Sequence, residues 1–106
     1  MNKEQAEQVS RQLSELLSGK SLIAVAVHPS AWLKVEVRPG IRFKGAYLVD
    51  YQNGKYSVAL SDSYGVMTGS DRWTFSDRGT VVAETTNAFG EALLFSWTVV
   101  EEEQHP

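Results

Sequence analysis

The stretch Ile41–Ser61, IRFKGAYLVDYQNGKYSVALS, predicts its own geometry. Asn53-Gly54 is the dipeptide that a two-residue β-hairpin turn prefers, because both central residues of that turn need positive φ. With this dipeptide at the tip, three apolar pairs face each other on one side of the hairpin: Tyr51 with Tyr56, Val49 with Val58, and Tyr47 with Leu60. A shift of one residue would turn every one of these side chains to the opposite face. We therefore predict a hairpin in this register, with a bend at Gly45.

The chain before the hairpin predicts one helix and two strands. Residues 2–17 carry apolar side chains at the three-and-four spacing of an amphipathic helix, which Asn2 and Gln5 can cap and Gly19 can end. Residues 22–28, LIAVAVH, are apolar on both alternations and predict an interior strand that is covered on both faces. Residues 33–38 alternate between apolar and charged side chains, which predicts a strand with its charged face in water. A three-residue turn at Arg38-Pro39-Gly40 would join this strand to the hairpin.

The chain after the hairpin predicts a three-stranded meander over residues 72–100. Three-residue loops that end in Gly79 and Gly90 keep apolar residues opposite each other. They pair Phe75 with Val81, Trp73 with Ala83, Arg72 with Glu84, Thr85 with Leu93, Ala83 with Phe95, and Val81 with Trp97. Residues 62–71 connect the two halves, either as an open loop or with a short edge strand at residues 66–68.

The number of strands predicts a curved sheet. About seven strands at ~4.8 Å spacing would make a flat sheet ~34 Å wide, which a helix ~10 Å across cannot cover. The aromatic face must therefore be buried by curling, by dimerisation, or by a ligand or partner; it comprises Phe43, Tyr47, Tyr51, Tyr56, Trp73, Phe75, Phe95 and Trp97. We prefer curling and predict an α+β fold: an N-terminal amphipathic helix packed on a strongly curved, mostly antiparallel sheet of about seven strands, half-barrel or barrel-like. This is one domain over residues 1–106, with the helix in 1–20, the sheet in 21–100 and an acidic tail in 101–106.

Composition excludes several classes of function. The chain has no cysteine, so thiolate zinc sites, disulfide frameworks and thiol catalysis are excluded, and a reducing compartment fits. The net charge of −3 argues against nucleic-acid binding, and the basic residues Lys34, Arg38, Arg42 and Lys44 are best explained as a solvated face. The apolar run at residues 22–27 is too short for a membrane span. We predict a soluble, cytoplasmic protein.

Catalytic and metal-binding patterns are weak. Of the two histidines, His105 lies in the charged tail and His28 ends a buried-looking strand, where bonding to the backbone is the simpler explanation. Turn chemistry accounts for Asp50, Asp62, Asp71 and Asp77, and no metal-loop spacing is present. We predict no enzyme activity, no metal and no cofactor.

The remaining candidates are exposed apolar residues in loops. Phe89 at a hairpin tip, Tyr64 and Met67 in the central loop, and Trp32 before a strand are typical of contact with a protein partner. The first hypothesis is a small protein-binding module of the inhibitor, immunity or adaptor type, acting through its loops and sheet surface. An alternative is a carrier that holds a small apolar ligand among Tyr47, Tyr51, Trp73 and Trp97. An enzyme that uses His28 is the weakest alternative, and a homodimer remains open.

Overall fold

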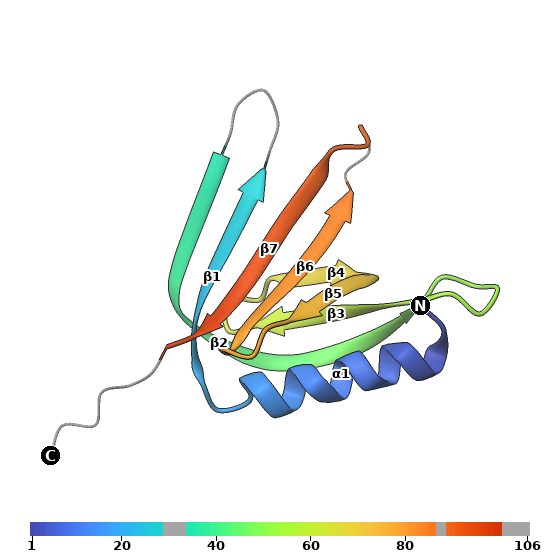
Figure 1. Cartoon of the computed structure of the whole chain (residues 1–106), viewed down its shortest axis with the longest axis horizontal. Coiled ribbons are helices and arrows are strands. Elements are labelled where there is room, and N and C mark those ends of the chain that lie inside the picture. The colour runs from blue at the N-terminus through green and yellow to red at the C-terminus, as the bar shows by residue number, and fades with distance from the viewer. Residues whose placement is uncertain (29–33, 87–88, 101–106) are drawn as a thin grey trace, which may run out of the picture.

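The computed structural model describes residues 1–28, 34–86 and 89–100, and within these ranges the chain forms one helix and seven strands (Figure 1). The elements are α1 (Lys3–Leu17), β1 (Ser21–His28), β2 (Lys34–Asp50), β3 (Tyr56–Asp62), β4 (Met67–Ser70), β5 (Arg72–Phe75), β6 (Thr80–Thr86) and β7 (Ala92–Val99). The strands form an antiparallel sheet in the order β4-β3-β2-β1-β7-β6-β5. The sheet curls into a half-barrel with the helix packed against it, which is the predicted α+β fold.

The sheet curls because β2 is one long, bent strand of 17 residues. Its first half pairs with β1, and its second half pairs with β3 from Phe43 onward. We call β1, β6, β7 and residues 34–41 of β2 the upper layer, which stands upright in Figure 1, and we call residues 43–50 of β2 with β3 and β4 the lower layer. The bend lies at Gly40, which has a φ of +70°, and the β1 register shifts opposite it, between Leu22 and Ala24.

The predicted hairpin turn at Arg38-Pro39-Gly40 is therefore wrong. The predicted turn would set Val37 opposite Ile41. In the structure, residues 34–38 pair with β1, which sets Val37 opposite Val25. Both pairings place apolar residues opposite each other, so the sequence pattern could not separate them. A second register shift, between Phe43 and Gly45, lies where we predicted the bend at Gly45.

The central hairpin exists, but its predicted register is wrong by one residue. Its loop has three residues, Gln52, Asn53 and Gly54, all with positive φ, and the Asp50 carboxylate accepts a hydrogen bond from the Gln52 N–H at 2.8 Å. The longer loop sets Leu48 opposite Val58 and Ala46 opposite Leu60. As a result Leu48 and Ala46 pack against the core, while Tyr47 and Tyr51 are exposed.

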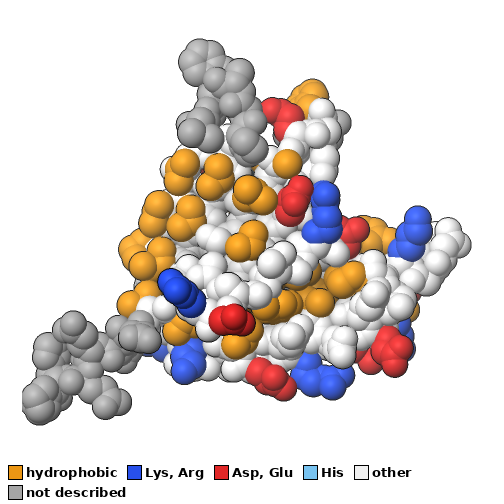
Figure 2. Space-filling model, in the orientation of Figure 1, with side chains coloured by type: hydrophobic (Ala, Val, Ile, Leu, Met, Phe, Trp, Pro, Cys, Tyr) orange, Lys and Arg blue, Asp and Glu red, His pale blue; other side chains and the backbone are white. Residues whose placement is uncertain are grey.

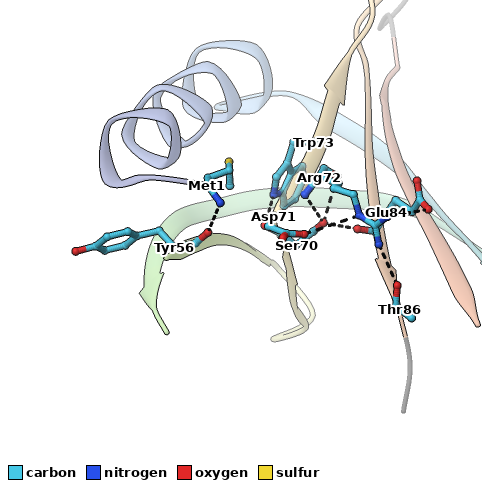
Figure 3. A network of polar contacts seen from close by, with 8 residues as sticks. All are labelled: Met1, Tyr56, Ser70, Asp71, Arg72, Trp73, Glu84 and Thr86. Carbon is cyan, nitrogen blue, oxygen red and sulfur yellow. Dashed lines mark hydrogen bonds and ion pairs between the residues drawn. The ribbon is translucent and has the colours of Figure 1, made fainter. Parts of the chain in front are cut away.

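The meander has the predicted register throughout. Phe75 pairs with Val81 across β5 and β6, and Val81 pairs with Trp97 across β6 and β7. The central segment contains the short edge strand β4, which is one of the two alternatives left open. Asp71 alone separates β4 from β5, so the two ends of the sheet meet at this corner, where the Trp73 indole N–H donates to the Ser70 carbonyl at 2.8 Å (Figure 3).

The core lies between the two layers and the helix. α1 packs on β2 and β3, and its buried face carries Ala6, Leu13 and Leu17. The core cluster consists of Ala6, Leu13, Leu17, Leu22, Ala24, Ile41, Val58, Leu60, Val81, Ala83 and Trp97. Within it the ring of Trp97 stacks with that of Trp73, with the centroids 5.5 Å apart.

The helix begins with the predicted capping box. The Asn2 side chain accepts a hydrogen bond from the Gln5 N–H at 2.8 Å, and the Gln5 side chain accepts one from the Asn2 N–H at 3.0 Å. We expect Asn2→Ala to lower the free energy of unfolding by about 1 kcal/mol, because the first turn then loses its side-chain acceptor. Urea denaturation followed by far-UV circular dichroism measures this loss. Asn2→Asp keeps the acceptor and should stay close to the wild type; an equal loss in both variants would contradict this role of the cap.

Candidate functional site

The three predicted loop residues that the structure describes are exposed but do not form one surface. Phe89 is 88% exposed, Tyr64 64% and Met67 60%, whereas Trp32 lies outside the described residues. Phe89 follows β6 at the end of the upper layer where β1 finishes. Tyr64 lies near the start of β1, because the neighbouring Ser63 bonds to Arg42, which pairs with Ser21. The length of β1, roughly 20 Å, separates the two sites.

The four residues of the predicted ligand cavity are not brought together. Trp73 and Trp97 stack inside the core, where Trp97 is 2% exposed. Tyr47 and Tyr51, at 51% and 63% exposure, lie outside it. The one-residue difference in hairpin register explains this, because it turns the two tyrosines away from the interior.

His28 is half-buried and packs against an aromatic side chain. Its ring meets that of Phe95 edge to face, with the centroids 6.3 Å apart, and its backbone pairs with Lys34. Across residues 1–28, 34–86 and 89–100, no cluster of three or more His, Asp or Glu side chains is arranged to hold a metal ion. No helix in the described part of the chain is long and apolar enough to cross a membrane.

An apolar surface that the sequence analysis missed covers the outer face of the upper layer. Register places Val25 beside Val37, and Val27 beside both Val35 and Leu94. We call this surface the convex patch; it consists of Ile23, Val25, Val27, Val35, Val37, Val82 and Leu94. Val35 is 52% exposed and Val37 59%. Figure 2 shows hydrophobic side chains gathered over this layer.

The convex patch corrects two predictions. The strand at residues 22–28 is not covered on both faces, because Ile23, Val25 and Val27 are only half-buried. The valines of β2 face water instead of the core, and Lys34 and Glu36 lie on the opposite, concave face with buried Ala26. The sequence did contain a signal for this surface. In residues 22–28 both sets of alternating positions are apolar, and the outward-facing set is matched by the alternating valines of the next strand.

The charged side chains on the concave face of β2 have partners. Lys34 Nζ lies 2.9 Å from Glu36 Oε1, and this hydrogen-bonded ammonium lowers the pKa of Glu36 below its ordinary value. Arg38 Nη1 lies 3.9 Å from Oδ2 of the buried Asp62. Arg42 follows the bend and donates to the Gly19 carbonyl at 3.3 Å. We predicted that the basic residues lie on the polar faces of two adjacent strands, but all four lie along the single bent strand β2: Lys34, Arg38, Arg42 and Lys44.

One side of the first half of β2 is an open edge. Residues 34–42 pair with β1, and pairing with β3 starts only at Phe43. Within the described ranges, no strand lies along the other side of residues 34–38. All four side chains of Lys34–Val37 are exposed, which means that both faces of this segment, as well as its edge, are open to water.

A shallow cavity of about 310 Å³, with polar and apolar lining in equal parts, lies near the tip of the central hairpin. It is lined by Met1, Tyr51, Lys55, Tyr56, Ser57, Gly69, Ser70, Asp71 and Thr85. Figure 3 shows the corner beside it, where Arg72 Nη1 lies 3.4 Å from Glu84 Oε1 and Arg72 Nη2 donates to Thr86 Oγ1 at 2.9 Å. These contacts tie β5 to β6, so Arg72, Glu84 and Thr86 have structural roles at this corner.

Comparison with known proteins identifies the fold and no family. No protein-family model matches the chain, and no curated protein matches it. Among solved structures, the chain is similar to the YojF protein of Bacillus subtilis, with 12% sequence identity, a TM-score of 0.57, and coverage of 95% of this chain and 94% of that one. At this identity the similarity extends to the fold alone: the helix and curled sheet form an arrangement that also exists in an experimentally determined structure.

Proposed function

We propose that this protein is a protein-binding module that pairs an extended segment of its partner with the open edge of β2. The observation that carries the proposal is the exposure of Lys34–Val37 on both faces and along one edge. An edge strand presents unpaired backbone N–H and C=O groups, which an added strand can bond in register. Recognition by strand addition needs no catalytic group and no deep cavity.

The side chains beside the edge define the partner segment. Val35 and Val37 stand on the convex face, so the partner strand would place apolar residues there. Lys34 and Glu36 stand on the concave face, so charged partner residues would lie opposite them. The convex patch extends over four strands and about five residues along them, a footprint of roughly 19 by 17 Å. Large exposed apolar patches often mark interaction sites.

A variant with a charge in the convex patch tests the proposal. We expect Val37→Glu to abolish retention of the partner in affinity capture from the native host lysate, because the carboxylate would lie against the apolar residue that the added strand places on the convex face. Tyr47→Glu is the matched control: Tyr47 is 51% exposed on another strand segment, outside the convex patch, and its replacement should leave retention unchanged.

The proposed binding edge is supported only by a protein that the wild type and the Tyr47→Glu control both retain and that the Val37→Glu variant does not retain. A photo-crosslinking amino acid in place of Val37 should then attach to that same protein. Equal retention by all three forms would contradict the proposal.

A further inference from the structure

We infer that the strand paired with the β2 edge is β2 of a second copy of this chain, antiparallel to the first about a two-fold axis at Val35. This inference rests on the proposed function and names its partner. The edge segment reads Lys34-Val35-Glu36-Val37-Arg38, with charges of alternating sign on one face and valines on the other. A strand of this pattern is complementary to itself when it is reversed.

The charges select the register of the pair. With the axis at Val35, Lys34 of each copy lies opposite Glu36 of the other, so both cross-strand pairs are of opposite charge. With the axis at Glu36, the two Glu36 side chains face each other, and Lys34 faces Arg38 of the other copy. Like charges directly opposite each other are unfavourable in an antiparallel ladder.

The bend excludes an axis at Val37. An axis at Val37 would pair Val35 with Pro39 and Lys34 with Gly40. Proline has no N–H to donate, and Gly40 has a φ of +70° where β2 turns away from the upper layer. Among the axes at Val35, Glu36 and Val37, only the axis at Val35 sets Lys34 opposite Glu36 without pairing residues at the bend.

The side chains are free to make these contacts. The Lys34 side chain is 67% exposed and that of Glu36 is 47% exposed, and the contact between them is local to one copy. Pairing would join two such contacts into a cluster of four alternating charges around the axis. On the opposite face Val35 would meet Val35, and the convex patches of the two copies would become continuous across the joined sheets.

The expected dimer is small and reversible. Within the described residues the ladder covers residues 34–36 of each copy, roughly 10 Å of edge, which is far below the area of a permanent interface. Proline, lysine and a bend are features that keep an edge strand from pairing with any strand it meets. This edge has Pro39, Lys34 and the bend at Gly40, so few strands can bind to it. We expect dissociation in the micromolar range or weaker.

Charge reversal tests the inference directly. Sedimentation equilibrium of the wild type, from micromolar to near-millimolar concentration, should show a monomer–dimer equilibrium. Lys34→Glu and Glu36→Lys should each weaken dimerisation by about tenfold or more, because each turns both cross-strand pairs into like-charge pairs. An equimolar mixture of the two variants should dimerise again, and so should the double variant Lys34→Glu with Glu36→Lys. Both positions are exposed, and far-UV circular dichroism confirms that each variant is folded.

Two results would overturn the inference: a wild type that stays monomeric at every concentration, or a dimer that both single variants form equally well. The wild type could be monomeric and still retain a host protein that the Val37→Glu variant loses. That result would exclude a second copy as the partner and would still support the proposed function. A monomeric wild type without any partner that depends on Val37 would overturn both.

Discussion

Replacing Trp97 with alanine is expected to lower the free energy of unfolding by about 3–5 kcal/mol, as large aromatic truncations in cores do. Trp97 is 2% exposed and pairs with Ala24 on β1 and with Val81 on β6. Its ring stacks with that of Trp73 at 5.5 Å and with that of Phe95 at 6.5 Å. The alanine variant leaves a cavity at the centre of the upper layer, and this loss is a large part of the roughly 5–15 kcal/mol typical of a domain.

The indole N–H groups of the two stacked tryptophans provide a sharper comparison. Trp97 Nε1 is buried without a hydrogen-bond partner within the described part of the chain, whereas Trp73 Nε1 donates to the Ser70 carbonyl at 2.8 Å. Trp97→Phe removes an unpaired donor, which offsets the cost of the smaller ring, so we expect stability within about 1 kcal/mol of the wild type. Trp73→Phe breaks the bond that joins the ends of the sheet and should cost about 1–2 kcal/mol more than Trp97→Phe.

Urea denaturation followed by far-UV circular dichroism measures all three variants without depending on tryptophan emission. Trp97→Phe stays informative even if Trp97→Ala does not fold. An equal loss for the two phenylalanine variants would contradict the expected difference between the two indoles, because it would mean that the two N–H groups contribute equally to stability.

The sequence predicted best where two local signals agreed. In the meander, the glycine-terminated loop at 77–79 and the apolar alternation require the same register, and Gly79 has the positive φ of +76° that such a loop needs. The helix was equally predictable, because its capping residues and its apolar face mark the same boundaries. The need for curvature followed from the strand count, because one helix cannot cover about seven strands.

Prediction from the sequence failed where the same residues are compatible with two different local structures. Asn53-Gly54 fits a two-residue turn, but Gln52 also adopts positive φ, and the Asp50 carboxylate stabilises the longer loop. The same ambiguity hid the convex patch: the valines of β2 alternate in the same way whether they face a core or water. Which face is covered depends on the bend at Gly40, a tertiary feature that no local pattern specifies.

Replacing Asp62 with alanine is the second large prediction, with an expected loss of about 2–3 kcal/mol. Asp62 is 4% exposed, and its Oδ1 accepts hydrogen bonds from the N–H groups of Tyr64 at 2.9 Å and Val66 at 3.1 Å. Its Oδ2 faces Arg38 at 3.9 Å. Alanine would leave two turn donors and a half-buried guanidinium without this acceptor at the corner between the layers. The loss is below that of a fully buried ion pair, because Arg38 is partly exposed and can turn toward water.

Asp50 provides the matched control, since it is an aspartate with a similar local bond in an exposed turn. Its Oδ1 accepts a hydrogen bond from the Gln52 N–H at 2.8 Å, and water can replace that acceptor, so Asp50→Ala should cost only about 0.5–1 kcal/mol. Asp62→Asn keeps an oxygen acceptor for Tyr64 and Val66 while it removes the charge that faces Arg38. An intermediate loss for Asp62→Asn would mean that the turn bonds and the ion pair both contribute. If Asp62→Ala cost no more than Asp50→Ala, burial would not strengthen the Asp62 contacts, and the closure of the two layers would depend on apolar packing alone.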